Sequence, residues 1–439
     1  MSSGLLGAGA IVAACTLAVK LVAMVKEMLV AAMFGTSVVL DAYLLAYALV
    51  AFLVNVFGGS LQSALVPVLV QARAAEGDST AQDVFRGTVT LAAVLLCGMA
   101  LLLATLASPL MRAFGESLPA RGAELAAAML VLMLPAIPLA GLVYVLMAGL
   151  NSMERFTLAA LIPAATPVAV LAAVVCAGDS LGGRALVAGT VIGAALELVA
   201  LTWALARHGL APWPVWPAST PRLAQVTGQY LPLIGGSCLM SAAPIIDQFM
   251  AAALGAGAVS ALAYGNKIVS VVLSVVSGAL GTVALPVFSR IAAAAGPDEL
   301  LDTLAYYRRR ILLVSVPISA AIVAGSGPLV WLLFERGAFT AADTARVSAL
   351  QAMLALQIPF TLMGILNVRA VSALGRNHVL LIGAAVNVLA NIAGNIVFSR
   401  YMGVAGIALS TSVVACLSDR FVYVYLQRQR GAAREQVSA

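Results

Sequence analysis

The sequence predicts an all-α membrane protein of about 12 transmembrane helices in two six-helix lobes, which a pseudo-two-fold axis along the membrane normal relates. Composition is the first observation behind this prediction: 62% of residues are hydrophobic, 10% are charged, and the mean hydropathy is +1.05. Together with many apolar runs of about 20 residues, it excludes soluble globular and disordered classes. The second observation is the order of these runs, and the third is an internal repeat.

The apolar runs give twelve predicted spans. They lie at residues 8–34, 42–70, 84–108, 123–150, 157–178, 185–206, 229–254, 259–288, 310–334, 346–372, 378–399 and 403–426.

The longest hydrophilic connections are 71–83, 207–228 and 289–309. Several prolines in the second of these exclude a continuous helix there. We therefore divide the chain into an N-lobe (1–206), a cytoplasmic linker (207–228), a C-lobe (229–428) and a cytoplasmic tail (429–439).

A pattern near the start of the chain returns half a chain later. The segments MFGTSVVLDAY (33–43) and GGSLQSALVPVL (58–69) are similar to ALGAGAVSALAY (253–264) and SGALGTVALPVF (277–288). With an even number of spans in each half, the repeat is parallel, an arrangement in which transporters move two lobes about a central site.

Arginine placement predicts the orientation. With both termini inside, 15 arginines belong to the inner side and 6 to the outer connections, and 13 remain inside when Arg369 and Arg420, which the spans contain, are left out. The positive-inside rule then places both termini in the cytoplasm.

Charged residues within the spans are the candidate site residues. The three lysines of the chain, Lys20, Lys26 and Lys267, all lie in apolar segments, where an ionised group is costly and usually faces a wet cavity. Lysine suits phosphate, so a cationic site for a phosphate or pyrophosphate is predicted. The alternative is structural pairing of a lysine with Glu27 or Asp247.

Three acids are candidates for gating or ion coupling. Glu27 shares the charged side of the first helix, Asp247 lies mid-span, and Asp41 is expected to cap the second helix. A further acid, Asp419, is expected to pair with its neighbour Arg420. Coupling to Na⁺, H⁺ or the membrane potential is predicted, with no other cofactor.

Several motifs are absent from the sequence. It contains no GxxxxGK[ST], no HExxH and no paired CxxC, and no basic patch with interleaved aromatics that would favour nucleic acid. We therefore expect no catalytic residues, no metal site and no enzyme activity. A glycan polymerase would need larger outer loops, and a scaffold protein would not need lysines inside the membrane.

Four segments resemble a known family. VKLVAMVKEMLVAAMFGTSVVLDAYLLAY, GGSLQSALVPVL, AVSALAYGNKIVSVVLSVVSGALGTVALPVFSR and LFERGAFTAADTARVSAL resemble signatures of the MurJ/MviN lipid II flippases, within the wider superfamily of multidrug and polysaccharide exporters. The resemblance covers the whole chain.

This resemblance implies a flippase that moves an undecaprenyl-pyrophosphate-linked saccharide to the outer leaflet of the bacterial cytoplasmic (inner) membrane by alternating access. It places Lys20, Lys26 and Lys267 where the family has cavity arginines, Glu27 where it has an acidic neighbour, and Asp41 at the outer gate. The implied partners are the polyprenyl-pyrophosphate-linked glycan and membrane lipids, with envelope-synthesis enzymes as further candidates.

The sequence departs from the family pattern in three places. All three matched cations are lysine, Val54 and Asn55 replace a basic pair, and the family carries two helices beyond the twelfth. Lipid II remains the favoured substrate, with an exopolysaccharide or O-antigen repeat unit as the alternative. A multidrug-type cation antiporter is less favoured, because it would need an anionic cavity.

Overall fold

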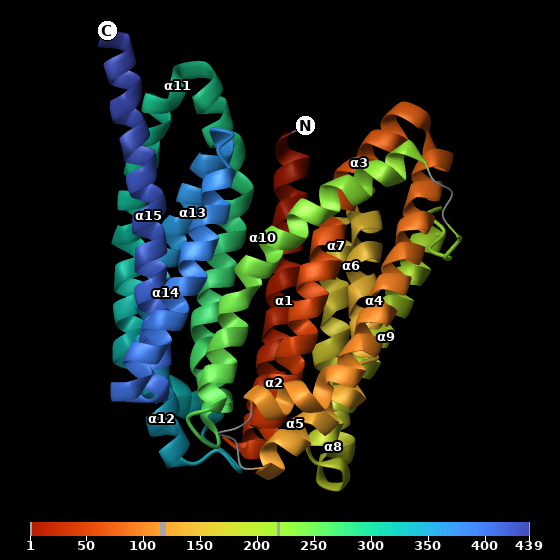
Figure 1. Ribbon diagram of the computed structural model, residues 1–439, viewed down its shortest axis with the longest axis vertical. Helices are drawn as coiled ribbons and strands as arrows, with labels where there is room; N and C mark the ends of the chain where they lie inside the picture. The colour runs from red at the N-terminus through yellow and green to blue at the C-terminus, as the bar shows by residue number, and fades with distance from the viewer. Residues whose placement is uncertain (1, 115–119, 217–219, 439) are drawn as a thin grey trace. The chain divides into compact units, whose positions relative to one another are not determined.

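The structure, a computed structural model, describes residues 2–114, 120–216 and 220–438, and every regular element in these ranges is a helix (Figure 1). The predicted all-α class is therefore confirmed. The helices of the first half are α1 (Ser2–Phe34), α2 (Val38–Leu53), the π-helix η1 (Val54–Gly59), α3 (Ser60–Glu76), α4 (Asp78–Phe114), α5 (Ala120–Met133), α6 (Ala136–Ser152), α7 (Phe156–Leu161), the 3-10 helix η2 (Ile162–Ala164), α8 (Ala165–Leu181) and α9 (Gly183–Arg207).

The second half contains fewer and longer helices. They are α10 (Pro221–Ala252), α11 (Ala258–Phe334), α12 (Ala341–Ala355), α13 (Ile358–Ala373), α14 (His378–Met402) and α15 (Val404–Ser438).

Ten of the described helical stretches are long and apolar enough to cross a membrane, and a bent pair makes an eleventh. The pair, Gly122–Met133 and Ala136–Ser152, bends by 48° where the chain passes Pro135. α1 adds a further apolar helix of 33 residues, which carries the charged face predicted from the sequence. The protein is thus a multi-pass membrane protein.

The chain divides into two compact units. Unit 1 comprises Met1–Ile245 with Gly255–Gly257, and unit 2 comprises Ile246–Leu254 with Ala258–Ala439. The division falls inside α10, so the last turns of this helix belong to unit 2. In unit 2, α13, α14 and α15 run side by side (Figure 1). The lobe limits and linker that the sequence predicts stay a prediction.

Two of the predicted hydrophilic connections are helical. In place of a loop over 71–83, α3 and α4 are separated by Gly77 alone, with φ 93° and ψ 178°. In place of a loop over 289–309, α11 continues and breaks only at Gly296, with φ 84° and ψ −179°. Positive φ of this kind favours glycine, so one glycine is enough to turn the chain. Polarity there indicates exposure to water and not the loss of helix.

Backbone geometry supports the internal repeat. Gly77 and Gly296 have the same conformation 219 residues apart. Gly182 (φ 53°, ψ −133°) and Gly403 (φ 57°, ψ −134°) form a second such pair between successive helices. Each of these two glycines donates its N–H to the carbonyl four residues earlier and accepts from the N–H three residues later. Unrelated halves have no reason to share these turns at a nearly constant offset.

The predicted linker is non-helical over residues 210–216 and lies along α4 within unit 1. Alternate linker carbonyls accept hydrogen bonds from α4 side chains one turn apart. Four residues of a helix span about 6 Å, and two residues of an extended chain span about 6.6 Å. The spacing of the α4 side chains therefore matches the spacing of the linker carbonyls. The bonds run from Gln82 to Ala211 (2.7 Å), from Arg86 to Trp213 (3.1 Å) and from Thr90 to Val215 (2.7 Å).

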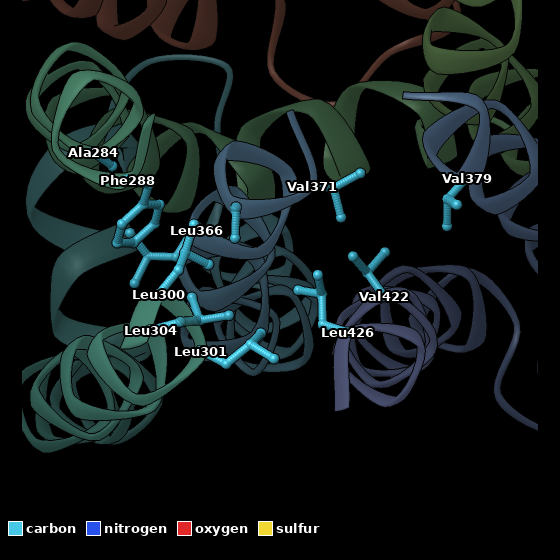
Figure 2. Close-up of a cluster of buried hydrophobic side chains, with 11 residues drawn as sticks. Ala284, Phe288, Leu300, Leu301, Leu304, Leu366, Val371, Val379, Val422 and Leu426 are labelled. Atoms are coloured by element: carbon cyan, nitrogen blue, oxygen red, sulfur yellow. The ribbon is translucent and has the colours of Figure 1, made fainter. Parts of the chain in front are cut away.

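Unit 2 has a hydrophobic core near the break at Gly296. Figure 2 shows Phe288, Leu300 and Leu304 of α11 converging with Leu366 of α13. All four side chains are at most 2% exposed. Because Leu300, Leu301 and Leu304 follow helical spacing, the hydrophilic stretch after Gly296 is amphipathic, and burial of its apolar face explains why it stays helical.

Candidate functional site

The charged face of α1 lies in unit 1 and is partly neutralised. Lys26 Nζ is 2.7 Å from Glu27 Oε1, and the two side chains are only 20% and 13% exposed. Lys20 is exposed about 9 Å earlier along the helix and has no ion pair among the described residues. The structure therefore brings Lys26 and Glu27 together and leaves Lys20 as an exposed positive charge.

Asp41 lies at the start of α2 but does not cap it. The cap is Ser37, whose Oγ accepts the N–H of Leu40, so the predicted capping role of Asp41 is wrong. The Asp41 side chain is fully buried, and its Oδ2 accepts the N–H of Gly257 at 2.6 Å. Asp41 thus connects α2 with the segment between α10 and α11. In the internal repeat, this segment corresponds to the one between α1 and α2.

The contact with Asp41 depends on a glycine. Gly257 has φ 76°, and a Cβ there would lie 2.8 Å from the carbonyl oxygen of Thr36. We expect Gly257→Ala to lower the free energy of unfolding by about 1–3 kcal/mol, because a left-handed backbone and a clash act together. Thermal melting in detergent measures this. Gly364→Ala, where a Cβ meets nothing within 4 Å, is the control, and equal melting of both variants would contradict the prediction.

A π-helical turn interrupts the second membrane span of unit 1. η1 contains Gly58, which packs against the backbone of Gly141 in α6, and a Cβ on Gly58 would lie 3.2 Å from Gly141 Cα. The hydroxyl of Tyr144 donates to Asn55 Oδ1 at 2.6 Å, and the hydroxyl of Tyr230 donates to the carbonyl of Phe57 at 3.2 Å. π-Helical turns are frequent at functional sites.

Tyrosines connect this turn with the charged face of α1. Tyr43 and Tyr47 of α2 stack with ring centroids 6.0 Å apart, and the Tyr43 hydroxyl hydrogen-bonds Thr190 at 2.9 Å. Tyr47 also lies near Lys26 of α1 and near Tyr144 of α6. These side chains form one polar face. We call it the α1–η1 face, and it consists of Lys26, Glu27, Tyr47, Tyr144 and Asn55.

A second polar cluster lies in unit 2 around Asp247, which is 8% exposed. Its Oδ1 accepts from Asn391 at 2.9 Å and from Asn395 at 2.7 Å, and its Oδ2 accepts from Thr411 at 3.1 Å. No ion pair is described for this carboxylate within residues 220–438. Asp247 is therefore held by α14 and α15, and it is not the partner of a lysine there.

The side chains that contact Asp247 are neutral hydrogen-bond donors. Asn395 Oδ1 is buried and has no hydrogen-bond partner in the described part of the chain. The carboxylate of Asp247 is therefore held by amide and hydroxyl groups that carry no charge.

Two further charged residues of interest in unit 2 are Lys267 and Arg308. Lys267 is half-buried on α11, in the other unit from Lys20 and Lys26, so a site of all three lysines stays a prediction. Arg308 is 8% exposed and pairs with Asp419, which corrects the expected Asp419–Arg420 pair. The two partners are 111 residues apart in sequence.

The charge of Asp247 within an apolar span singled it out in the sequence, whereas the residues that hold it were not predicted. Asn391 and Asn395 are four residues apart within an apolar span, which places both on one face of α14. That spacing was a usable signal. Tyr144 had no comparable signal, because a single tyrosine in a span is common. Among the described residues, no group of three or more His, Cys, Asp and Glu side chains could hold a metal ion.

Comparison with known proteins identifies a family model and relatives. A model described as "Lipid II flippase MurJ" matches residues 30–439. A protein of Synechocystis named a probable lipid II flippase MurJ is 27% identical over 98% of this chain and 82% of its own length. The similarity therefore extends over both units.

Solved structures of two transporter classes share the fold. Lipid II flippase MurJ in an inward closed conformation matches with a TM-score of 0.81 at 20% identity, over 95% of this chain and 87% of that one. An inward-facing multidrug resistance MATE family transporter of the MOP superfamily also gives 0.81, at 13% identity, over 97% and 100%. At these identities the structural similarity shows the fold alone. The match to the MurJ family model is what distinguishes the flippase class from the multidrug transporter class for this chain.

Proposed function

We propose that this chain, which belongs to the lipid II flippase MurJ family, translocates lipid II, an undecaprenyl-pyrophosphate-linked peptidoglycan precursor, from the inner to the outer leaflet by alternating access. The match of the family model to residues 30–439 carries the proposal. The protein resides in the bacterial cytoplasmic membrane with both termini in the cytoplasm, as the arginine distribution indicates.

The lysines bind the pyrophosphate in this proposal. Lys26 is the principal residue, because it is partly desolvated and a charge-assisted contact is strong in such a place. Lys20 contributes less, since it is exposed and screened by water. Lys267 supplies a cation from unit 2. Glu27 keeps Lys26 oriented while no substrate is bound.

Asp41 acts as a gating residue. Its hydrogen bond to Gly257 joins the first helices of unit 1 to the segment that leads into α11. A single buried contact of this kind is worth about 1.5–3 kcal/mol when one partner is charged. It is therefore strong enough to favour one conformation and weak enough to break during a transport cycle.

Flipping of lipid II in proteoliposomes tests the function. Purified protein is reconstituted with lipid II, and an impermeant enzyme or label added outside reports the molecules that reach that leaflet. Lipid II is expected to be flipped, whereas an O-antigen repeat unit on the same carrier lipid is expected to move more slowly. Faster movement of the O-antigen lipid would favour the alternative substrate, and movement of neither would remove the proposal.

Asp247 is proposed as the coupling site for a monovalent cation. Asp247 has no cationic partner among the described residues. A buried carboxylate in that state is costly, so its negative charge favours a bound Na⁺ or a proton. Net movement of charge would also respond to the membrane potential, at about 2.3 kcal/mol per charge and 100 mV. Asp247 is therefore expected to link transport to an ion gradient.

We expect Asp247→Asn to remove the response of the protein to its coupling ion. For the unmodified protein, Na⁺ in place of choline should raise the melting temperature if Na⁺ binds, because a ligand of the folded state stabilises it. Ser412→Ala is the matched control, since Ser412 is buried next to Thr411 on α15 but donates to Met353. A Na⁺ response that survives in Asp247→Asn would contradict the assignment. Transport that responds to a pH gradient and not to a Na⁺ gradient would identify H⁺ as the coupling ion.

A further inference from the structure

The α1–η1 face contains a hydrogen-bonding pair that the proposed binding of pyrophosphate does not use. Asn55 is exposed and lies near the middle of the helical stretch Val38–Glu76, which is 39 residues long. An exposed amide at that depth would lose its hydrogen bonds in lipid, at a cost of several kcal/mol. We therefore infer that Asn55 faces water, at a depth near the middle of the membrane span.

The contact with Tyr144 fixes the orientation of this amide. The phenol O–H donates to Asn55 Oδ1, so Nδ2 points away from it, and no bond of this amino group is described within residues 2–114, 120–216 and 220–438. The phenol oxygen of Tyr144 keeps acceptor capacity. The pair thus presents two N–H donors and an acceptor that carry no net charge.

The π-helical turn is what gives Asn55 this position. Tyr43, Tyr47, Ala51 and Asn55 follow one another at four-residue spacing, so they share one face of the helix. After the wider turn the next residue in line is Ser60, five positions on, which is buried and hydrogen-bonds Ser237 at 2.8 Å. Tyr47 and Asn55 are therefore the exposed polar residues of this face, and Asn55 is the last of them.

We propose that Asn55 and Tyr144 form a subsite for the neutral, saccharide-bearing part of the carried lipid, beside the pyrophosphate position at Lys26. This inference rests on the proposed function. Amide and hydroxyl groups of a sugar offer both donors and acceptors, which an uncharged amide–phenol pair matches and a lysine does not. Tyr47, which is 42% exposed, adds a flat ring face beside the pair. A few such polar groups set orientation and specificity in ligand sites.

Binding of two lipids to protein in phosphatidylcholine nanodiscs tests the subsite. The probes are lipid II and undecaprenyl pyrophosphate, which lacks the saccharide. Asn55→Ala is expected to weaken lipid II binding about tenfold, as loss of one or two hydrogen bonds does, and to leave undecaprenyl pyrophosphate unchanged. Tyr144→Phe, which keeps the ring, should act in the same direction and serves if Asn55→Ala does not fold.

Ser63→Ala is the matched control, because Ser63 is exposed one turn beyond η1 and its hydroxyl bonds only the carbonyl of Gly59 in its own helix. Equal weakening of both lipids, or no weakening of either, would overturn the subsite. Equal affinity of the unmodified protein for both lipids would overturn it as well. If the unmodified protein binds neither lipid, the proposed function itself fails, so the two failures are distinguishable.

Discussion

Lys26→Ala is expected to abolish flipping of lipid II while folded protein remains in the membrane. Lys26 is the partly desolvated cation of the α1–η1 face, and loss of a charge-assisted contact with pyrophosphate costs about 1.5–3 kcal/mol, or roughly 10- to 100-fold in binding. Transport in proteoliposomes and melting temperature should be measured side by side.

The ion pair with Glu27 offers a structural explanation that must be separated from this one. Lys26→Ala removes the ion pair with Glu27, whose side chain is only 13% exposed, and this loss by itself lowers stability. In the double variant Lys26→Ala/Glu27→Ala the melting temperature should recover, but transport should not. Recovery of transport in the double variant would show that the lysine serves only to pair Glu27.

Two further variants strengthen the test of Lys26. Lys26→Arg should keep transport, because arginine restores the charge and binds phosphate through a planar fork. Lys20→Ala should reduce transport less than Lys26→Ala, since Lys20 is exposed and about 9 Å away along the helix. A larger loss for Lys20→Ala would move the principal binding position toward the start of α1.

The sequence predicted the helices well and the connections poorly. Apolar length sets where a membrane helix lies, and this signal is local. Whether a polar segment stays helical depends on what covers one of its faces. Leu300, Leu301 and Leu304 gave that signal after Gly296, but a hydropathy profile averages it with the polar residues between them. The helical stretch over 297–309 was therefore predicted as a connection.

The sequence did not predict which residues pair with the charged side chains when the partners are far apart in the chain. Lys26 and Glu27 are neighbours, and their pairing was among the stated alternatives. Asp419 was assigned to its neighbour Arg420, whereas its partner Arg308 lies on another helix. Asp247 meets Asn391 and Thr411 across more than 140 residues. Single-sequence reasoning favours local pairs, because long-range contacts require the packing of α10, α14 and α15.

The ion pair between Arg308 and Asp419 joins three helices of unit 2. Both guanidinium NH groups donate to Asp419, at 2.5 and 2.8 Å, and Arg308 also donates to Asn367 Oδ1 at 2.9 Å. Asn367 in turn donates to Asp419 Oδ1 at 2.8 Å, and Tyr423 lies 4.1 Å beneath the guanidinium carbon. α11, α13 and α15 therefore meet in one buried network, in which each charge is satisfied.

Arg308→Ala is expected to destabilise unit 2 by about 3–5 kcal/mol, because it leaves the carboxylate of Asp419, which is 2% exposed, without a cation. Arg308→Lys should recover only part of this, since lysine cannot bind both carboxylate oxygens in a planar fork. Replacing both partners, as Arg308→Leu/Asp419→Leu, should melt above Arg308→Ala, because no unpaired charge remains. The exposed neighbour in Arg309→Ala should change stability by less than about 0.5 kcal/mol. Chemical or thermal unfolding of the purified protein measures all four, and an Arg308→Ala variant as stable as Arg309→Ala would show that the buried network contributes nothing to the fold.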